Sequence, residues 1–334
     1  MIKKILKYII PIKFHTRLKS INRKILLLSF YWSDIKHLIY KNQIVKDESK
    51  FFDTKAKVIK YYHRLEKSLS TPNFTKGRGA RAAYDLIDAL SVYKSNNFDL
   101  DDIQIKVARN VLNQFIEKQD DEDVIKLKDL TSKLDIEIDF SISGGSLTLE
   151  NDYFLKHING NFRDLSSHRH SVRDYEKQEV DISLIYEAIN IAQKTPSVCN
   201  RQGWHVILIT NSDVIKLFRE IHNGFARPDQ YLSTLIVVCF SKSSFDYPLE
   251  RNQGYTDGGL FSMSIMYALT HLGLASCPLN ANLPKDAEKK LRNAINLSNE
   301  FGLVMFIAVG HYKDKTIVPV SQRDPHNKKI HHIK

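Results

Sequence analysis

The stretch LIVVCF, residues 235–240, is a continuous apolar run of the length of a single β-strand. A strand that is apolar at every position is typical of a sheet covered on both faces. The segments WHVILIT, 204–210, and LVMFIAVG, 303–310, predict two further strands, the second being the last strand of the chain. We expect these strands to form the centre of the fold.

Helical patterns separate the predicted strands. Pro196 ends one apolar-faced helix, Asn211 can cap another, and Gly273 follows a helix that is apolar nearly all round. Helices alternate with strands, so we expect helices to cover a central mixed sheet in an α+β fold. The predicted helices are 182–192, 212–221, 257–271 and 284–295, the last opening on Pro284.

The N-terminal half has a different sequence pattern, with predicted helices and no predicted strands. Residues 50–135 are mostly helical in pattern, and SISGGSLTLE, 141–150, resembles a linker in its serine and glycine content. We predict four parts: a basic amphipathic arm (1–46), a helical module (47–140), a linker (141–162) and a sheet-containing domain (163–334). The predicted helices of the module are 51–67, 80–93 and 101–118, with the acidic DDED at 120–123 either a loop or a helix start.

The net charge of +11 is concentrated in one segment, because residues 1–46 carry eleven Lys or Arg and one acid, Asp34. The rest of the chain is nearly neutral, which argues against a nucleic-acid partner. No run approaches the ~20 apolar residues of a membrane span. The arm is either a basic amphipathic segment on an anionic membrane surface or a partly disordered or partner-docked extension.

The three cysteines, Cys199, Cys239 and Cys277, form no C-x-x-C pair, so neither a disulfide framework nor a metal site is indicated. Reduced thiols suit a cytoplasmic protein, with a peripheral position at the inner face of the membrane as a further expectation for the arm.

The segment RHSVRDY, 169–175, gathers Arg169, His170, Ser171 and Arg173 on one short turn before a helix. Guanidiniums offer planar, charge-assisted donors to phosphate oxygens, and the hydroxyl adds another. Taken alone, the cluster is more simply a solvated basic turn.

Two other turns contain groups suited to a flat heterocycle, and a third segment contains an arginine after the predicted last strand. PSVCNRQGW, 196–204, offers neutral donors and acceptors from Ser197, Asn200 and Gln202. GLASCPLNAN, 273–282, brings apolar backbone and amide groups after the core helix, and SQR, 321–323, supplies a late arginine. Each taken singly is an ordinary turn, a buried connection or a surface arginine.

In their order and spacing, these four motifs resemble the flavin-dependent nitroreductase family over about residues 163–334. The resemblance implies a nitroreductase-like mixed or antiparallel sheet covered by helices, preceded here by a mostly helical region. It also implies a homodimer with FMN at the subunit interface and NAD(P)H as co-substrate.

The resemblance implies roles for individual residues. Arg169, His170, Ser171 and Arg173 are expected to hold the phosphate, ribityl chain and pyrimidine edge of FMN, with Arg323 at the phosphate. A turn of the partner subunit is expected to approach the same flavin, and a third turn to flank the ring near N5. These further residues are Pro196, Ser197, Asn200 and Gln202 from the partner, Pro278, Leu279 and Asn280 near N5, and Asn223 on a weaker alignment.

The chain departs from the family at several positions. It has Gly203 where many members have Pro, Asn280-Ala281 where many have Glu-Gly, and Ser321 in place of a Lys. The region between Phe240 and Asp257 is short, so the insertion that often covers the pocket is reduced. Because Asn280 replaces the glutamate, the contact that many family members use to bind the nicotinamide is in question.

The cofactor implies ping-pong hydride transfer from NAD(P)H to an unidentified electron acceptor, with no catalytic side-chain acid or base. The alternative is a flavin-fold protein that is not a reductase and binds or modifies a polysaccharide precursor within an assembly complex. A short stretch, YHRLEKSLSTPNF, 62–74, resembles a segment ahead of such domains in proteins from surface-polysaccharide gene clusters. The simpler interpretation of its His63, Arg64, Glu66 and Lys67 is a solvated helix face.

Overall fold

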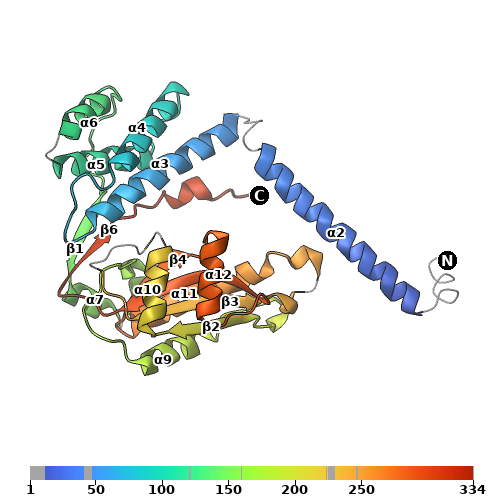
Figure 1. Ribbon diagram of the computed structural model, residues 1–334. Helices are drawn as coiled ribbons and strands as arrows, with labels where there is room; N and C mark the ends of the chain where they lie inside the picture. The colour runs from blue at the N-terminus through green and yellow to red at the C-terminus, as the bar shows by residue number, and fades with distance from the viewer. Residues whose placement is uncertain are drawn as a thin grey trace.

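The apolar run at 235–240 forms the inner strand β3 of a four-stranded antiparallel sheet in the computed structural model (Figure 1). The structure describes residues 12–40, 47–119, 122–158, 160–222, 224, 230–245 and 247–333. The strand order is β2-β3-β5-β4, with Val237 of β3 opposite Ile207 of β2 and Phe306 of β5. The bounds are β2 Trp204–Ile209, β3 Thr234–Ser241, β4 Ala275–Asn280 and β5 Phe301–Gly310.

Both faces of this sheet are covered, which explains why β3 is apolar at successive positions. Leu235 and Val237 belong to the core beneath α10 and α12, whereas Ile236 and Val238 belong to the core beneath α9 and α11. Alternate residues of a strand point to opposite faces, so each face has its own apolar layer. The helices are α9 Ile182–Ala192, α10 Ser212–Ile221, α11 Gln253–His271 and α12 Lys285–Ala294, as predicted apart from small shifts at their ends.

The N-terminal part forms a separate helical core. Leu65, Leu86 and Phe115 are fully buried in it, and Asp102 caps its third helix by accepting from the backbone N–H of Gln104. The predicted α+β class, an antiparallel sheet covered by helices behind a mostly helical region, is confirmed. The bounds are α3 Asp47–Leu69, α4 Ala80–Ser95, α5 Ile103–Glu117 and α6 Glu122–Ser132.

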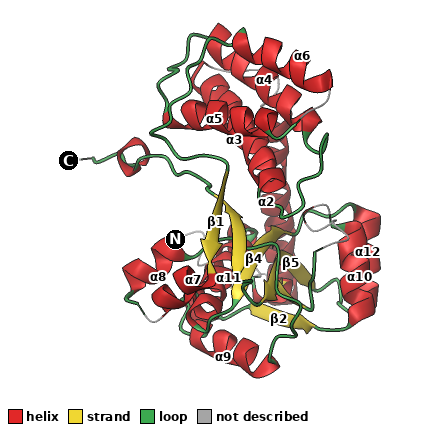
Figure 2. Ribbon diagram, turned by 90° about the vertical axis from the view of Figure 1, so that its left-hand side faces the viewer, coloured by secondary structure: helices red, strands yellow, loops and turns green. Residues whose placement is uncertain are grey.

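A two-stranded sheet lies between the helical module and the larger sheet (Figures 1 and 2). Strand β1 (Ser146–Glu150) pairs with β6 (Lys315–Pro319), placing Ser146 opposite Pro319. The segment 141–162, predicted as a linker, therefore contains a strand, and it continues into α7 (Asn151–Ile158) before α8 (Phe162–His168). The prediction that 303–310 is the last strand is wrong, because β6 follows it.

The helical module docks on the C-terminal segment through buried polar groups. The Lys55 ammonium lies 2.7 Å from an Asp102 carboxylate oxygen and 3.4 Å from one of Asp324. The Glu66 side chain is fully buried and accepts from the backbone N–H of Ser321 at 3.3 Å. Buried charges are tolerated when they are paired in this way, so this contact specifies how α3 lies against the sheet domain. We call it the polar seam.

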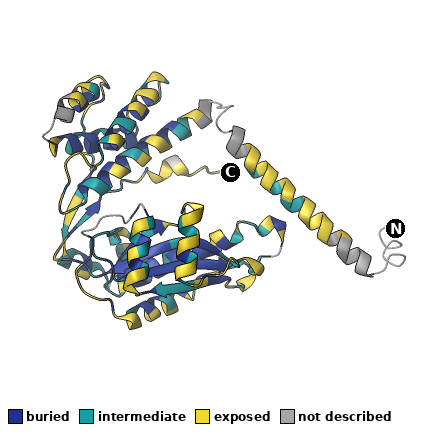
Figure 3. Ribbon diagram, viewed as in Figure 1, coloured by how far each residue is buried: buried dark blue, intermediate teal, exposed yellow. Residues whose placement is uncertain are grey.

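The basic arm contains one long helix, α2 (Ile12–Tyr40), which is largely exposed (Figure 3). It contacts the sheet domain where Asp34 accepts two hydrogen bonds from Arg251, each 3.0 Å, and where that guanidinium lies over the Phe30 ring. Among the helices in the described ranges, none is both long and apolar enough to cross a membrane. The predicted residues 1–11 and 41–46 of the arm lie outside the described residues.

The buried aromatic ring of Phe115 tests the helical core. Phe115 is 0% exposed and packs edge-on against Phe74, whereas Phe140 in the same module is 90% exposed. We expect Phe115→Ala to lower the free energy of unfolding by about 3–5 kcal/mol, since it removes buried surface and leaves a cavity. Phe140→Ala should change it by less than about 0.5 kcal/mol. Equal effects of the two substitutions in urea denaturation would contradict this core.

Candidate functional site

The RHSVRDY segment extends the sheet along the β4 edge. The backbone N–H of Val172 donates to the Ser276 carbonyl at 3.0 Å, and Ser171 and Ser276 form a parallel bridge. The buried hydroxyl of Tyr175 donates to the carbonyls of Val172 and Ala308, at 2.8 and 3.1 Å. These contacts fix the segment against β4, so that two stretches about a hundred residues apart in sequence become neighbours.

Two buried polar atoms lie unpaired where this segment meets β4. The Nη1 of Arg169 and the Oγ of Ser276 are both buried and have no hydrogen-bond partner in the described part of the chain. Burial lowers the pKa of Arg169, and the nearby charge of Arg323 lowers it further. A buried donor without a partner is costly, and a phosphate oxygen is an acceptor suited to a guanidinium.

His170 is held neutral beside these arginines. Burial is the main cause, followed by the charges of Arg169, His168 and Arg323, and together they lower the pKa of His170 to about 4. Its Nε2 lies 3.3 Å from the Tyr153 hydroxyl. An anion placed among these groups would be stabilised by their positive charge.

A cleft of about 570 Å³ lies between this edge of the sheet domain and the helical module. Its volume lies within the usual range for a small-molecule or cofactor site. Of the predicted residues, Arg173 and Asn280 line it. The sheet domain also contributes Gly224 and Gln230, and the module contributes Arg64, Lys67, Ser68, Thr71, Arg78, Gly79, Arg81, Ala82 and Asp85.

The solvated helix face predicted for 63–67 is wrong for two of its residues. Glu66 is fully buried in the polar seam, and Lys67 is half-buried in the wall of the cleft. Arg64 is exposed, as predicted, but it also lines the cleft. The helical pattern gave no sign of this, because the face meets the sheet domain only in the folded chain.

The segment SCPLN, 276–280, for which the sequence favours a buried connection, is part of the edge strand β4. Pro278 is compatible with an edge strand, which leaves one row of backbone groups unpaired. The Leu279 side chain is buried in the core, so only its backbone is available to a ligand. The Nε2 of His222, a residue not predicted, donates to the Asn280 carbonyl at 2.9 Å, and its Nδ1 accepts from the Gly224 N–H at 3.1 Å. The predicted Asn223 lies outside the described residues.

The predicted turn before β2 lies at the opposite edge of the sheet from β4, so within a single chain it does not reach the cleft. This turn contains Pro196, Ser197, Asn200 and Gln202. Within the turn, Ser197 Oγ accepts from the Gln202 N–H, and buried Asp257 of α11 accepts from the Val198 N–H. Cys199, Asn200 and Gln202 all have positive φ, near 50°. Such strained backbone persists where surrounding contacts hold it, and it is common at ligand sites.

A histidine pair links α7 to α8 beside this site. The Nδ1 atoms of His157 and His168 lie 2.9 and 3.2 Å from the two carboxylate oxygens of Asp164, and the rings stack 3.4 Å apart at 3°. Two parallel rings cannot both hold one ion in their planes, so this geometry suits the shared carboxylate better than a metal ion. The hydrogen bond from His157 is the main cause of the lowered pKa of Asp164.

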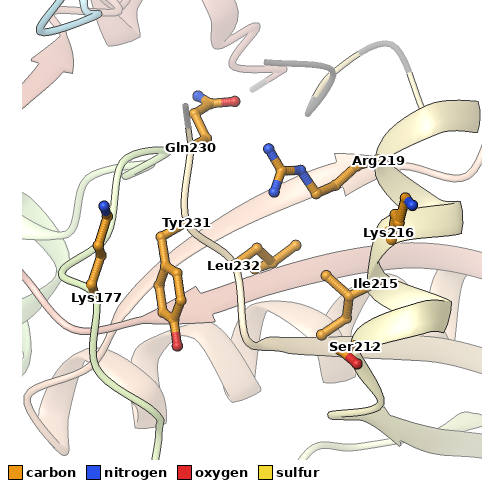
Figure 4. Close-up of a pocket in the computed structure, with 8 residues that line it drawn as sticks. All are labelled: Lys177, Ser212, Ile215, Lys216, Arg219, Gln230, Tyr231 and Leu232. Carbon is orange, nitrogen blue, oxygen red and sulfur yellow. The ribbon is translucent and has the colours of Figure 1, made fainter. Parts of the chain in front are cut away.

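A second cavity, of about 380 Å³, lies beside α10 (Figure 4). Lys177, Lys216 and Arg219 surround it, and Gln230 is shared with the larger cleft. It contains none of the predicted site residues. The cleft between the helical module and β4 is therefore the candidate site.

Comparison with known proteins points to the same part of the chain. A family model described as the nitroreductase family matches residues 167–249. This segment includes the arginine cluster and the Pro196–Gln202 turn. The sheet domain is thus similar to the nitroreductase family over this segment, and the match supports an oxidoreductase.

Three curated relatives are similar over parts of the chain. A protein of Archaeoglobus fulgidus, provisionally named NADH dehydrogenase/NAD(P)H nitroreductase, is 24% identical over 44% of this chain and 83% of its own length. A protein of the same name from Methanothermobacter thermautotrophicus is 29% identical over 32% of this chain and 54% of its own length. The CLA biosynthesis enone reductase of Lactiplantibacillus plantarum is 24% identical over 31% of this chain and 49% of its own length.

Solved structures align with about half of the chain. A nitroreductase family protein of Clostridium difficile 630 gives a TM-score of 0.45 at 21% identity, covering 52% of this chain and 99% of that one. A nitroreductase of Desulfovibrio desulfuricans, crystallised with FMN, gives 0.45 at 15% identity over 53% and 98%.

The neutral His170 makes the ligand-free protein sensitive to acid. Its folded pKa of about 4 lies below the ordinary value of about 6.5, so between these values the unfolded chain binds a proton that the folded chain does not. We expect the free energy of unfolding to fall as pH drops from 6.5 to 4, and His170→Asn to reduce that fall. The check is urea denaturation at several pH values, and an unchanged pH dependence in the variant would contradict the assignment.

Proposed function

We propose that the chain is an FMN-dependent NAD(P)H oxidoreductase whose flavin lies in the cleft between β4 and the helical module. The observation that carries this proposal is that the RHSVRDY segment runs along β4 and places there Arg169, whose buried Nη1 is unpaired, and Arg173, which lines the cleft. The family match over 167–249 supports the same chemistry.

The residues present fit FMN in two places. Arg169, Ser171 and Arg323, beside the neutral His170, are suited to a phosphate, because guanidiniums and a hydroxyl supply several donors. Arg173 and the backbone of Pro278, Leu279 and Asn280 are suited to the pyrimidine edge and ring face. A cation at the pyrimidine edge favours the reduced, anionic form of a flavin.

When bound, FMN supplies the redox chemistry, in which NAD(P)H, one proton and an oxidised acceptor give NAD(P)+ and the acceptor reduced by two electrons. The protein holds and orients the reactants, and hydride transfer from a nicotinamide needs no side-chain base. One cleft serves both reactants, so they occupy it in turn. The acceptor and the choice between NADH and NADPH are not part of the proposal.

We also propose a homodimer. Pro196, Asn200 and Gln202 are exposed and lie across the sheet from the cleft, so they reach a flavin only if it belongs to a second copy. The helices next to this turn, α9 and α11, expose large apolar side chains, an arrangement typical of an interaction surface. These are Ile182, Tyr186 and Ile191 on α9, and Tyr255 and Leu260 on α11.

Peripheral membrane contact through α2 is a further part of the proposal. Exposed Leu18, Ile25, Leu28 and Trp32 share the helix with several lysines and arginines, as in helices that lie on anionic lipid. Sedimentation with vesicles of phosphatidylglycerol tests it.

The link to surface polysaccharide synthesis, and the alternative of a flavin-fold protein that is not a reductase, stay predictions.

Flavin titration tests the proposed cofactor site. We expect the purified chain to bind FMN, and Arg169→Gln to raise the Kd about ten-fold to a hundred-fold, since it removes a charge-assisted hydrogen bond. Lys290→Gln, an exposed charge change on α12, should leave the Kd unchanged. The measurement is quenching of flavin fluorescence.

Stopped-flow absorbance then tests the reaction. Bound FMN should be bleached within a turnover by NADH or NADPH. Binding without bleaching would support the non-reductase alternative, and absence of binding would overturn the proposed function.

A further inference from the structure

The cleft contains more positively charged side chains than contacts to a flavin ring require. Arg64, Lys67, Arg78 and Arg81 of the helical module and Arg173 of the sheet domain line it, together with one carboxylate, Asp85. None of the five cations forms an ion pair with a residue in the described ranges. Several cations gathered in a concave site attract an anion that carries more than one negative charge.

The five cations come from several separate stretches of chain, so the cluster is not a consequence of one helix's amphipathic pattern. Arg64 and Lys67 lie on α3, Arg78 precedes α4, and Arg81 lies in its first turn. Gly79, with φ of 104°, allows the chain to turn between them. A Cβ at this glycine would lie 3.1 Å from the Phe115 ring, so the turn is pressed closely onto the core of the module.

Lys67 shows that these charges act on one another. Burial is the main cause of its lowered pKa, followed by the charge of Arg173 across the cleft, with Arg64 adding to the effect. Half-buried Lys67 lies in the wall of the cleft, and the cations around it form no ion pair within the described ranges. An anion between the two walls would relieve this repulsion.

This group is distinct from the proposed phosphate site of FMN. Arg169 and His170 interact with Arg323, whereas Arg173 interacts with Lys67. The two groups are joined along the RHSVRDY segment. A ligand lying over the proposed flavin would therefore have its charged end against the helical module.

We propose that the helical module is a phosphate-binding wall of the active site, in which Arg64, Arg78 and Arg81 bind phosphate groups of the molecule that faces the flavin. This inference rests on the proposed function. Phosphate is favoured over a single carboxylate because several guanidiniums match a group with more than one negative charge. The phosphate belongs either to the diphosphate of NAD(P)H or to a phosphorylated acceptor.

The test compares the wild type with the triple variant Arg64→Gln, Arg78→Gln, Arg81→Gln. All three side chains are exposed, so the fold is expected to survive, and circular dichroism checks it. Lys128→Gln is the matched control, because Lys128 is an exposed cation of the same module that does not line the cleft. FMN content and Kd are measured first, and we expect both to be unchanged in the triple variant.

Calorimetric titration of the FMN-loaded chain with inorganic pyrophosphate is a binding readout independent of turnover. We expect the triple variant to bind it at least about ten-fold more weakly than the wild type, from the loss of several charge-assisted hydrogen bonds. The Lys128→Gln protein should match the wild type. Equal affinity in all three proteins, or no binding to the wild type, would overturn the inference.

Two half-reactions identify the source of the phosphate. If it belongs to the dinucleotide, the triple variant loses about ten-fold in the rate of flavin reduction at low NADH concentration. If it belongs to the acceptor, the loss appears with 4-nitrophenyl phosphate and not with the neutral 4-nitroanisole. A loss below two-fold in both half-reactions overturns the inference while leaving the proposed function intact. Failure of FMN binding or bleaching in the wild type overturns the proposed function, and the pyrophosphate titration, carried out on the FMN-free chain, then decides the phosphate wall by itself.

Discussion

The polar seam between α3 and the C-terminal segment is the constraint on which the candidate site depends. Lys55 joins Asp102 of the helical module to Asp324, and buried Glu66 receives the N–H of Ser321. Removing one member of a buried ionic group leaves an uncompensated charge, at a cost of about 3–5 kcal/mol. The seam therefore holds α3 in one position, with Arg64 and Lys67 facing the end of β4.

This docking combines a surface of the sheet domain and a surface of the helical module into one site, although neither surface forms a site by itself. The sheet domain alone supplies an edge strand, an arginine cluster and unpaired polar atoms. The helical module alone supplies exposed cations on helix and turn. Their combination gives a cleft with a basic wall opposite the proposed flavin position.

Sequence patterns predicted the parts of the fold that depend on local burial. The run at 235–240 is apolar because both faces of β3 are covered, and the helices of the module follow from their 3.6-residue periodicity. Strand β4 was missed because Ser276, Pro278 and Asn280 are poor strand formers, which are tolerated at an edge. Strand β1 is not evident from its local pattern, because its partner β6 lies about 170 residues away.

In the candidate site too, local motifs could be predicted from the sequence, whereas contacts between distant segments could not. Arg169 and Arg173 could be predicted because they lie close together in a recognisable motif. The roles of Glu66 and Lys67 could not, because a charged helix face looks the same whether water or another domain meets it. His222 was missed for a similar reason, since its hydrogen bond to Asn280 joins residues that are 58 apart in the chain.

Hydrogen–deuterium exchange tests most directly the claim that the two parts share one site. It compares amide exchange in the full chain before and after addition of FMN with inorganic pyrophosphate. The account predicts slower exchange both at 167–176 in the sheet domain and at 60–82 in the helical module. Slower exchange confined to the sheet domain, with 60–82 unchanged, would contradict it.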